Sequence, residues 1–125
     1  MQEQIMGTSY AAILGQMVKQ LREEAKPHLD QKDVAKHLGV SVMTISRIES
    51  GDTVLDVPQM EKVAQFFKMD PLEFFKKSLA IKQKLEKDKF KVLEDKKEIN
   101  NTPNFAAVSL ALVAGVVVAI LLTRK

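Results

Sequence analysis

Apolar residues recur at helical spacing from the start of the chain to about residue 69. One group follows the i, i+3/i+4, i+7 spacing of a helix with a buried face: Ile13, Leu14, Met17, Val18 and Leu21. The same spacing predicts further helices with apolar positions in 34–38, 45–48 and 60–67. No segment alternates with period two for long enough to form a strand. We therefore predict an all-α fold.

Residues with known capping preferences mark the expected ends of these helices. Thr8 or Ser9 can cap the first helix, and Ser41 can cap the third. Gly39 follows the second helix at once, where a left-handed conformation ends many helices. Asp70-Pro71 combines an N-cap with proline at the first helical position. Five helices are thus expected, the fifth starting at residue 71.

A strongly charged segment, residues 82–98, follows the expected start of the fifth helix. Between residues 82 and 98, 12 of 17 residues are charged, seven Lys and five acids. One interpretation is an exposed helical spacer, stabilised by charge pairs four residues apart. The alternative is a weak dimerising coiled coil, because Leu85, Val92 and Ile99 recur every seven residues. Asn and Pro residues in 100–104 should break this helix.

An uncharged apolar run occupies residues 105–122. As a helix these 18 residues would span ~27 Å, close to the ~30 Å hydrocarbon core of a bilayer. We therefore predict a single transmembrane helix at 105–123, a tail anchor. Five Lys precede this run within twenty residues and two basic residues follow it, so the positive-inside rule places the N-terminal part in the cytoplasm.

Small residues recur every fourth position in this run: Ala107, Ala111, Gly115 and Ala119. Such a pattern lets two membrane helices approach closely. It predicts a transmembrane dimer seam and, with it, a homodimer.

Charge and composition narrow the function classes. Residues 1–70 hold 8 Lys/Arg and 10 Asp/Glu, net −2, whereas residues 71–125 hold 11 and 6, net +5. There is no cysteine and there are only two histidines, without metal-binding spacing. No phosphate-binding glycine loop or nucleophile motif is present. We predict a non-enzymatic protein without metal or cofactor.

Residues 29–51 read LDQKDVAKHLGVSVMTISRIESG. This segment resembles the helix-turn-helix of the Cro/phage-repressor (XRE-like) family, and the likeness extends over about residues 13–70. The matching elements are Gln31, Ala35, the turn at 38–41 and the run Thr44 to Glu49 before Gly51. Ala35 is small enough for two helices to cross closely, and Gly39 permits the sharp turn.

The resemblance implies that the third helix, about residues 42–50, enters the major groove of double-stranded DNA. It implies base contacts from Val42, Met43, Ser46 and Arg47. Gln31, Ser41 and Thr44 would bind backbone phosphates. Arg22 and Glu49 would form a structural pair that holds the third helix.

The combined prediction is a five-helix Cro/repressor-type domain (1–70), a long charged helical spacer and breaker (71–104) and one transmembrane helix (105–123). Its expected function is a membrane-tethered, sequence-specific transcriptional regulator in the bacterial inner (cytoplasmic) membrane. The alternative is a membrane-anchored adaptor whose third helix binds a protein such as a cytoskeletal filament. The net negative domain and the apolar Val42 and Met43 favour that alternative.

Overall fold

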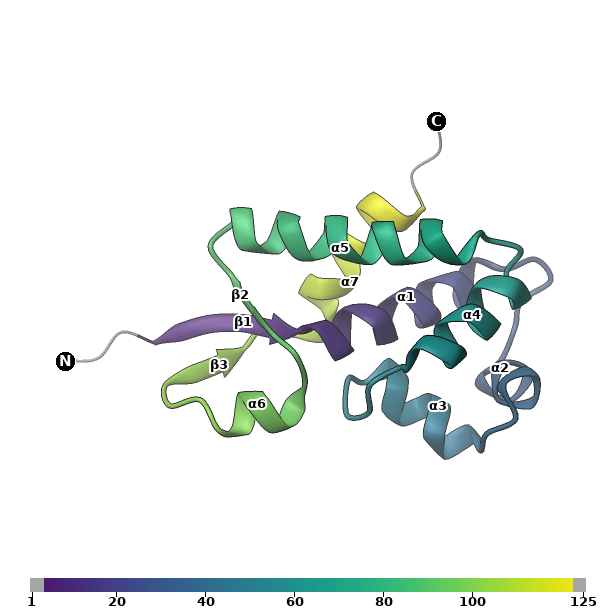
Figure 1. Ribbon diagram of the computed structural model, residues 1–125, viewed down its shortest axis with the longest axis horizontal. Helices are drawn as coiled ribbons and strands as arrows, with labels where there is room; N and C mark the ends of the chain where they lie inside the picture. The colour runs from purple at the N-terminus through teal and green to yellow at the C-terminus, as the bar shows by residue number, and fades with distance from the viewer. Residues whose placement is uncertain (1–3, 123–125) are drawn as a thin grey trace.

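The computed structural model describes residues 4–122, which form seven α-helices and three short β-strands (Figure 1). The order along the chain is β1 Ile5–Ser9, α1 Tyr10–Glu24, α2 Gln31–Leu38, α3 Val42–Glu49, α4 Val57–Phe66, α5 Pro71–Lys87, β2 Lys91–Leu93, α6 Lys96–Asn100, β3 Phe105–Ala107 and α7 Leu110–Leu121.

Capping side chains fix the starts of several helices. The Ser9 hydroxyl accepts a hydrogen bond from the Ala12 N–H at 3.0 Å and so begins α1. The Asp70 carboxylate accepts from the Leu72 N–H at 3.1 Å, ahead of Pro71 at the first position of α5. The helices expected up to residue 71 are therefore present. Ser9, Ser41 and Asp70 cap α1, α3 and α5 as the sequence suggested, whereas the caps of α2 and α4, Asp30 and Asp56, were not predicted.

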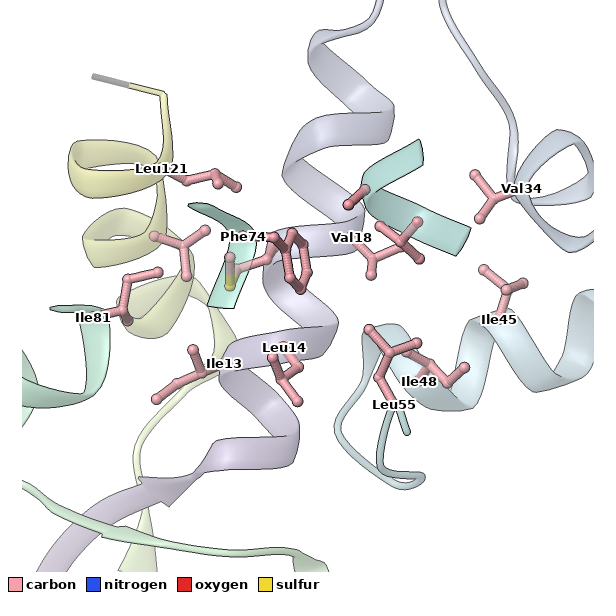
Figure 2. Close-up of a cluster of buried hydrophobic side chains, with 14 of the residues drawn as sticks. Ile13, Leu14, Val18, Val34, Ile45, Ile48, Leu55, Phe74, Ile81 and Leu121 are labelled. Carbon is pink, nitrogen blue, oxygen red and sulfur yellow. The ribbon is translucent and has the colours of Figure 1, made fainter. Parts of the chain in front are cut away.

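The helix α1 runs through the middle of the molecule, with α5 on one side and α2 and α3 on the other (Figure 1). Figure 2 shows the two groups of side chains that cover it. Val34, Ile45 and Ile48 approach α1 from the helix-turn-helix side, and Phe74 and Leu121 approach it from α5 and α7. All belong to one continuous hydrophobic core.

A small parallel sheet pairs β1, near the start of the described chain, with two short strands from residues 91–107. Its strand order is β2-β1-β3, with Thr8 opposite Val92 and Met6 opposite Ala106. The expectation of an all-α fold is therefore wrong. Strands of three to five residues are too short to produce a period-two pattern, and their pairing joins segments far apart in the sequence.

The expected long charged helix is also wrong, because α5 ends at Lys87. Lys89 adopts a left-handed conformation with φ 75°, and the Phe90 N–H donates to the Leu85 carbonyl at 2.9 Å. Phe90 then packs against the core and Leu93 is buried. Leu85, Val92 and Ile99 consequently lie in α5, β2 and α6, which excludes a continuous coiled-coil seam through them.

The apolar run at 105–122 does not form one helix. Phe105–Ala107 pairs with β1, and Ser109 caps a separate helix of 12 residues, α7. Among residues 4–122 no helix has both the length and the apolar character needed to cross a membrane. The expected transmembrane helix and the single-pass location in the bacterial inner membrane are therefore wrong. Residue 123, the expected end of that helix, lies outside the described residues.

Instead, α7 packs against α1 and α5. Val113, Val117 and Leu121 recur every fourth residue and are buried in the core. The Lys77 ammonium on α5 donates to the carbonyls of Ile120 and Leu121 at 3.3 and 3.1 Å, which satisfies acceptors at the C-terminal end of α7. The apolar residues of α7 thus form part of the protein core.

The predicted membrane seam is distributed over two elements. Ala107 lies in β3 opposite Gly7, whereas Ala111, Gly115 and Ala119 lie on the exposed side of α7. Because the four residues do not share one helix, they do not form the helix–helix seam that the spacing suggested.

Two neighbouring valines of α7 test this packing. Val117 is buried, whereas Val118 is exposed. Val117→Asp should lower the free energy of unfolding by about 3 kcal/mol or more, because it buries a charge without a partner. Val118→Asp should change it by less than about 0.5 kcal/mol. Urea denaturation of the full chain measures both values, and equal effects would contradict the packing of α7.

Candidate nucleic-acid interface

The turn between α2 and α3 sets the relative orientation of these two helices. Gly39 ends α2 in a left-handed backbone conformation with φ 72°. Residues other than glycine adopt this conformation only at a cost in free energy. The Val40 N–H then donates to the Ala35 carbonyl at 3.0 Å. The Ser41 hydroxyl accepts from the Thr44 N–H at 3.1 Å and begins α3 two residues after the turn.

The helix α3 has one buried face and one face directed outward. Ile45 and Ile48 are fully buried against α1 and α2. The side chains of Val42, Met43, Ser46 and Arg47 are exposed, and Thr44 is half-buried. The four residues expected to contact bases therefore lie together on the outer face of one short helix.

The buried end of α3 is held by an ion pair to α1. Arg22 Nε donates to Glu49 Oε2 at 2.9 Å, and a terminal guanidinium nitrogen donates to Glu49 Oε1 at 3.0 Å. Both residues are buried. The hydrogen bonds to Glu49 raise the pKa of the Arg22 guanidinium above its ordinary value, so Arg22 stays positively charged. Such a two-point contact fixes direction as well as distance.

Two glutamines extend this network. Gln16 Nε2 of α1 donates to the Glu49 backbone carbonyl at 2.9 Å. Gln31 Nε2, at the first position of α2, donates to Glu49 Oε1 at 2.9 Å. Glu49 thereby connects α1, α2 and α3. The sequence did not suggest a Gln31–Glu49 contact, because a glutamine at a helix start carries no signal for a partner eighteen residues away.

The three expected phosphate-contacting residues lie at the N-terminal ends of α2 and α3. Ser41 and Thr44 share a hydrogen bond between their hydroxyl oxygens, which are 3.0 Å apart. Gln31 directs one amide hydrogen at Glu49 and has a second for another acceptor. The Gln31 amide thus lies beside the C-terminal end of α3, whereas the Ser41 and Thr44 hydroxyls lie at its N-terminal end.

Acidic groups border this surface. The Asp33 carboxylate accepts from the Asp30 N–H at 2.8 Å at the start of α2. The Asp56 carboxylate accepts from the Gln59 N–H at 2.8 Å at the start of α4. Each acid occupies a helix N-terminus and opposes the approach of a phosphate there. The exposed cations Lys32, Lys36 and Arg47 supply the opposite charge.

The helix α6 makes an unexpected contact with the loop that follows α3. Lys96 Nζ lies 3.1 Å from Asp52 Oδ1. The hydrogen bond from Lys96 lowers the pKa of the Asp52 carboxyl, and the positive charge of Arg47 adds to this effect. Arg47 itself makes no salt bridge within residues 4–122. Lys96 is 44 residues from Asp52 in sequence, so local patterns gave no indication of the pair.

Within residues 4–122 no group of three or more His, Asp or Glu side chains could hold a metal ion. His37 of α2 stacks on Phe66 of α4, with ring centroids 4.5 Å apart. His28 lies 3.7 Å from Asp30 in the loop before α2. The outer face of α3 offers hydroxyl, thioether, aliphatic and guanidinium groups, from Ser46, Met43, Val42 and Arg47.

The Arg22–Glu49 pair has a direct stability test. Glu49→Ala should lower the free energy of unfolding by about 3–5 kcal/mol, because the buried Arg22 guanidinium loses its carboxylate partner. Glu24→Ala removes an exposed carboxylate of α1 and should cost less than about 0.5 kcal/mol. Thermal and urea unfolding report both changes. A loss at position 49 no larger than at position 24 would contradict the role of the pair.

Comparison with known proteins gives one result for this region. The chain matches no curated protein and no solved structure. A family model does match, and it covers residues 18–74, from the middle of α1 into the first turn of α5. This segment contains α2, the turn at Gly39 and the whole of α3. By sequence, residues 18–74 match the Helix-turn-helix family.

Proposed function

We propose that this protein is a transcriptional regulator that binds double-stranded DNA sequence-specifically and places α3 in the major groove. The match of residues 18–74 to the Helix-turn-helix family supports DNA binding. The proposal includes no membrane tether. The membrane-anchored adaptor is not retained either, because the helix that should anchor it is too short to cross a membrane.

One observation carries the proposal: α3 is fixed on its inner face and open on its outer face. Ile45, Ile48 and the Glu49 ion pair hold its inner face. Val42, Met43, Ser46 and Arg47 remain accessible on the other side. A rigid helix with a short polar and apolar outer face fits the width of the major groove.

Each outer residue has a distinct expected contact. Arg47 has the donor geometry to bind guanine O6 and N7 with two hydrogen bonds. Val42 and Met43 have no side-chain donor, so they can distinguish bases only by packing against thymine methyl groups. Ser46 can donate to or accept from a base edge. A site that combines a G·C pair with neighbouring A·T pairs suits this set.

Backbone contacts should position α3 in the groove. Gln31, Ser41 and Thr44 offer neutral donors to phosphate oxygens, and Lys32 and Lys36 on α2 add positive charge. Asp33 and Asp56 oppose phosphates at the starts of α2 and α4. The affinity for DNA of unrelated sequence should therefore be low, since few cations drive counterion release.

The test is selection of binding sites from a random DNA pool by the full-length protein, followed by titration of the selected site. Arg47→Ala should weaken binding to that site about 10- to 100-fold, because one bidentate base contact accounts for about 1–3 kcal/mol. Lys87→Ala removes one exposed positive charge at the far end of α5 and should change affinity less than about twofold.

Circular dichroism spectra of both variants control for folding. Equal affinity of wild type and Arg47→Ala for the selected site would contradict the placement of α3. Failure to enrich any sequence would contradict sequence-specific DNA binding itself.

A further inference from the structure

The loop between α3 and α4 carries an acidic residue next to the arginine expected to contact bases. The N–H groups of Asp52 and Thr53 donate to the Arg47 backbone carbonyl at 2.9 and 3.2 Å, which folds Asp52 back onto the last turn of α3. Gly51 is buried, and a Cβ at this position would lie 3.1 Å from Ala12 Cα. Contact with α1 therefore fixes the loop, and with it Asp52, beside Arg47.

Asp52 and Arg47 carry opposite charges and are both exposed. The positive charge of Arg47 contributes to the lowered pKa of the Asp52 carboxyl, so the two groups already interact through space. Direct pairing between them would compete with DNA. A guanidinium that donates to a carboxylate has fewer donors left for guanine O6 and N7.

The helix α6 supplies a different partner for this carboxylate. Lys96 Nζ lies 3.1 Å from Asp52 Oδ1. Asp95 caps α6 by accepting from the Glu98 N–H at 2.9 Å, which begins the helix at Lys96. In Figure 1, α6 and α3 lie on the same side of the path formed by β1 and α1. Arg47 forms no salt bridge within residues 4–122, so its guanidinium stays available to DNA.

We propose that Lys96 is a positioning residue for DNA recognition: it holds the Asp52 carboxylate and so prevents Asp52 from pairing with Arg47. The inference rests on the proposed function, in which Arg47 binds guanine. It gives α6 a role in base recognition although α6 lies outside residues 18–74, the segment that matches the Helix-turn-helix family. Lys96 itself contacts no base and acts only through Asp52.

A direct contact between Lys96 and a DNA phosphate would have a different signature. Loss of a phosphate contact weakens binding to all sequences alike and does not depend on the side chain at position 47. Loss of the hold on Asp52 weakens only binding that uses Arg47. Combining Lys96→Ala with Arg47→Ala therefore separates the two explanations.

Titration of the selected DNA site by variants of the full chain tests the proposal. Lys96→Ala should weaken binding about two- to fivefold, because the Asp52 carboxylate becomes free to pair with Arg47 and exposed ion pairs account for factors of this size. Adding Asp52→Asn should restore wild-type affinity, since a neutral amide competes much less for the guanidinium. Lys96→Arg should also retain wild-type affinity, because it keeps the ion pair to Asp52.

The matched control is Lys97→Ala. Lys97 is the next residue of α6, is exposed, and makes no salt bridge in the part of the chain that the structure describes. Its removal takes the same charge from the same helix and should change affinity less than about 1.5-fold, because salt screens an unpaired surface charge. Thermal unfolding of each variant controls for folding.

Three results of the titration would overturn the proposal. One is an equal loss of affinity from Lys97→Ala and Lys96→Ala, which would indicate a general effect of charge. Another is failure of Asp52→Asn to restore binding by Lys96→Ala. The third is a loss from Lys96→Ala that is the same in the Arg47→Ala background as in wild type, since the proposal expects no further loss there.

NMR spectroscopy of the DNA-free protein tests the same relation without reference to function. In Lys96→Ala the Nε–H of Arg47 should shift and exchange with water more slowly than in wild type, because it gains a carboxylate acceptor. Adding Asp52→Asn should reverse both changes. An Arg47 signal that does not respond to Lys96→Ala would overturn the proposal. A responding signal in a protein that selects no DNA site would overturn the proposed function and leave the hold of Lys96 on Asp52 intact.

Discussion

The burial of α1 on two sides is the constraint on which the rest of the structure depends. Ile13, Met17 and Val18 are fully buried, as is Ala11. On one side Gly15 touches α3 so closely that a Cβ would lie 1.9 Å from the Ile48 carbonyl oxygen. The helix-turn-helix cannot also cover the opposite side of α1. That side needs α5 and α7, so the apolar C-terminal segment becomes part of the same core.

The exposed face of α3 follows from that packing. Ile45 and Ile48 bury its inner face against the α1 side of the core, and Glu49 links its end to Arg22 and Gln31. These contacts leave little freedom to rotate α3 about its own axis. The residues proposed to contact bases are therefore presented by the core rather than by a mobile loop. The Arg22–Glu49 ion pair, Ile45 and Ile48 thus fix the proposed DNA-binding face of α3 to the core.

Local chemistry explains how much of this could be predicted from the sequence. Ser9, Ser41 and Asp70 cap helices where their side chains can reach backbone N–H groups, and Gly39 ends α2. Each signal acts over a few residues. The family resemblance predicts the Arg22–Glu49 pair, and the structure places Arg22 Nε 2.9 Å from Glu49 Oε2. The candidate site was thus accessible from short-range patterns and one motif.

The wrong predictions, an all-α fold and a membrane span, concern segments whose packing partners are distant in sequence. An uncharged run of 18 residues suits a membrane or a protein core equally, and only the partner of Val113 and Val117 decides between them. The parallel pairing of β1 with β2 and β3, and the Lys96–Asp52 contact, likewise join segments without local signals. Hydropathy describes what a segment can bury, but it does not identify what covers it.

The central claim is that α7 completes the core of the helix-turn-helix. Native-state amide hydrogen exchange of the full chain, in buffer without lipid or detergent, tests this claim most directly. If α7 and α1 belong to one cooperative unit, the amides of Val117 and Leu121 should open with nearly the same free energy as those of Met17 and Val18. Rapid exchange throughout α7 beside a protected α1 would contradict a shared core.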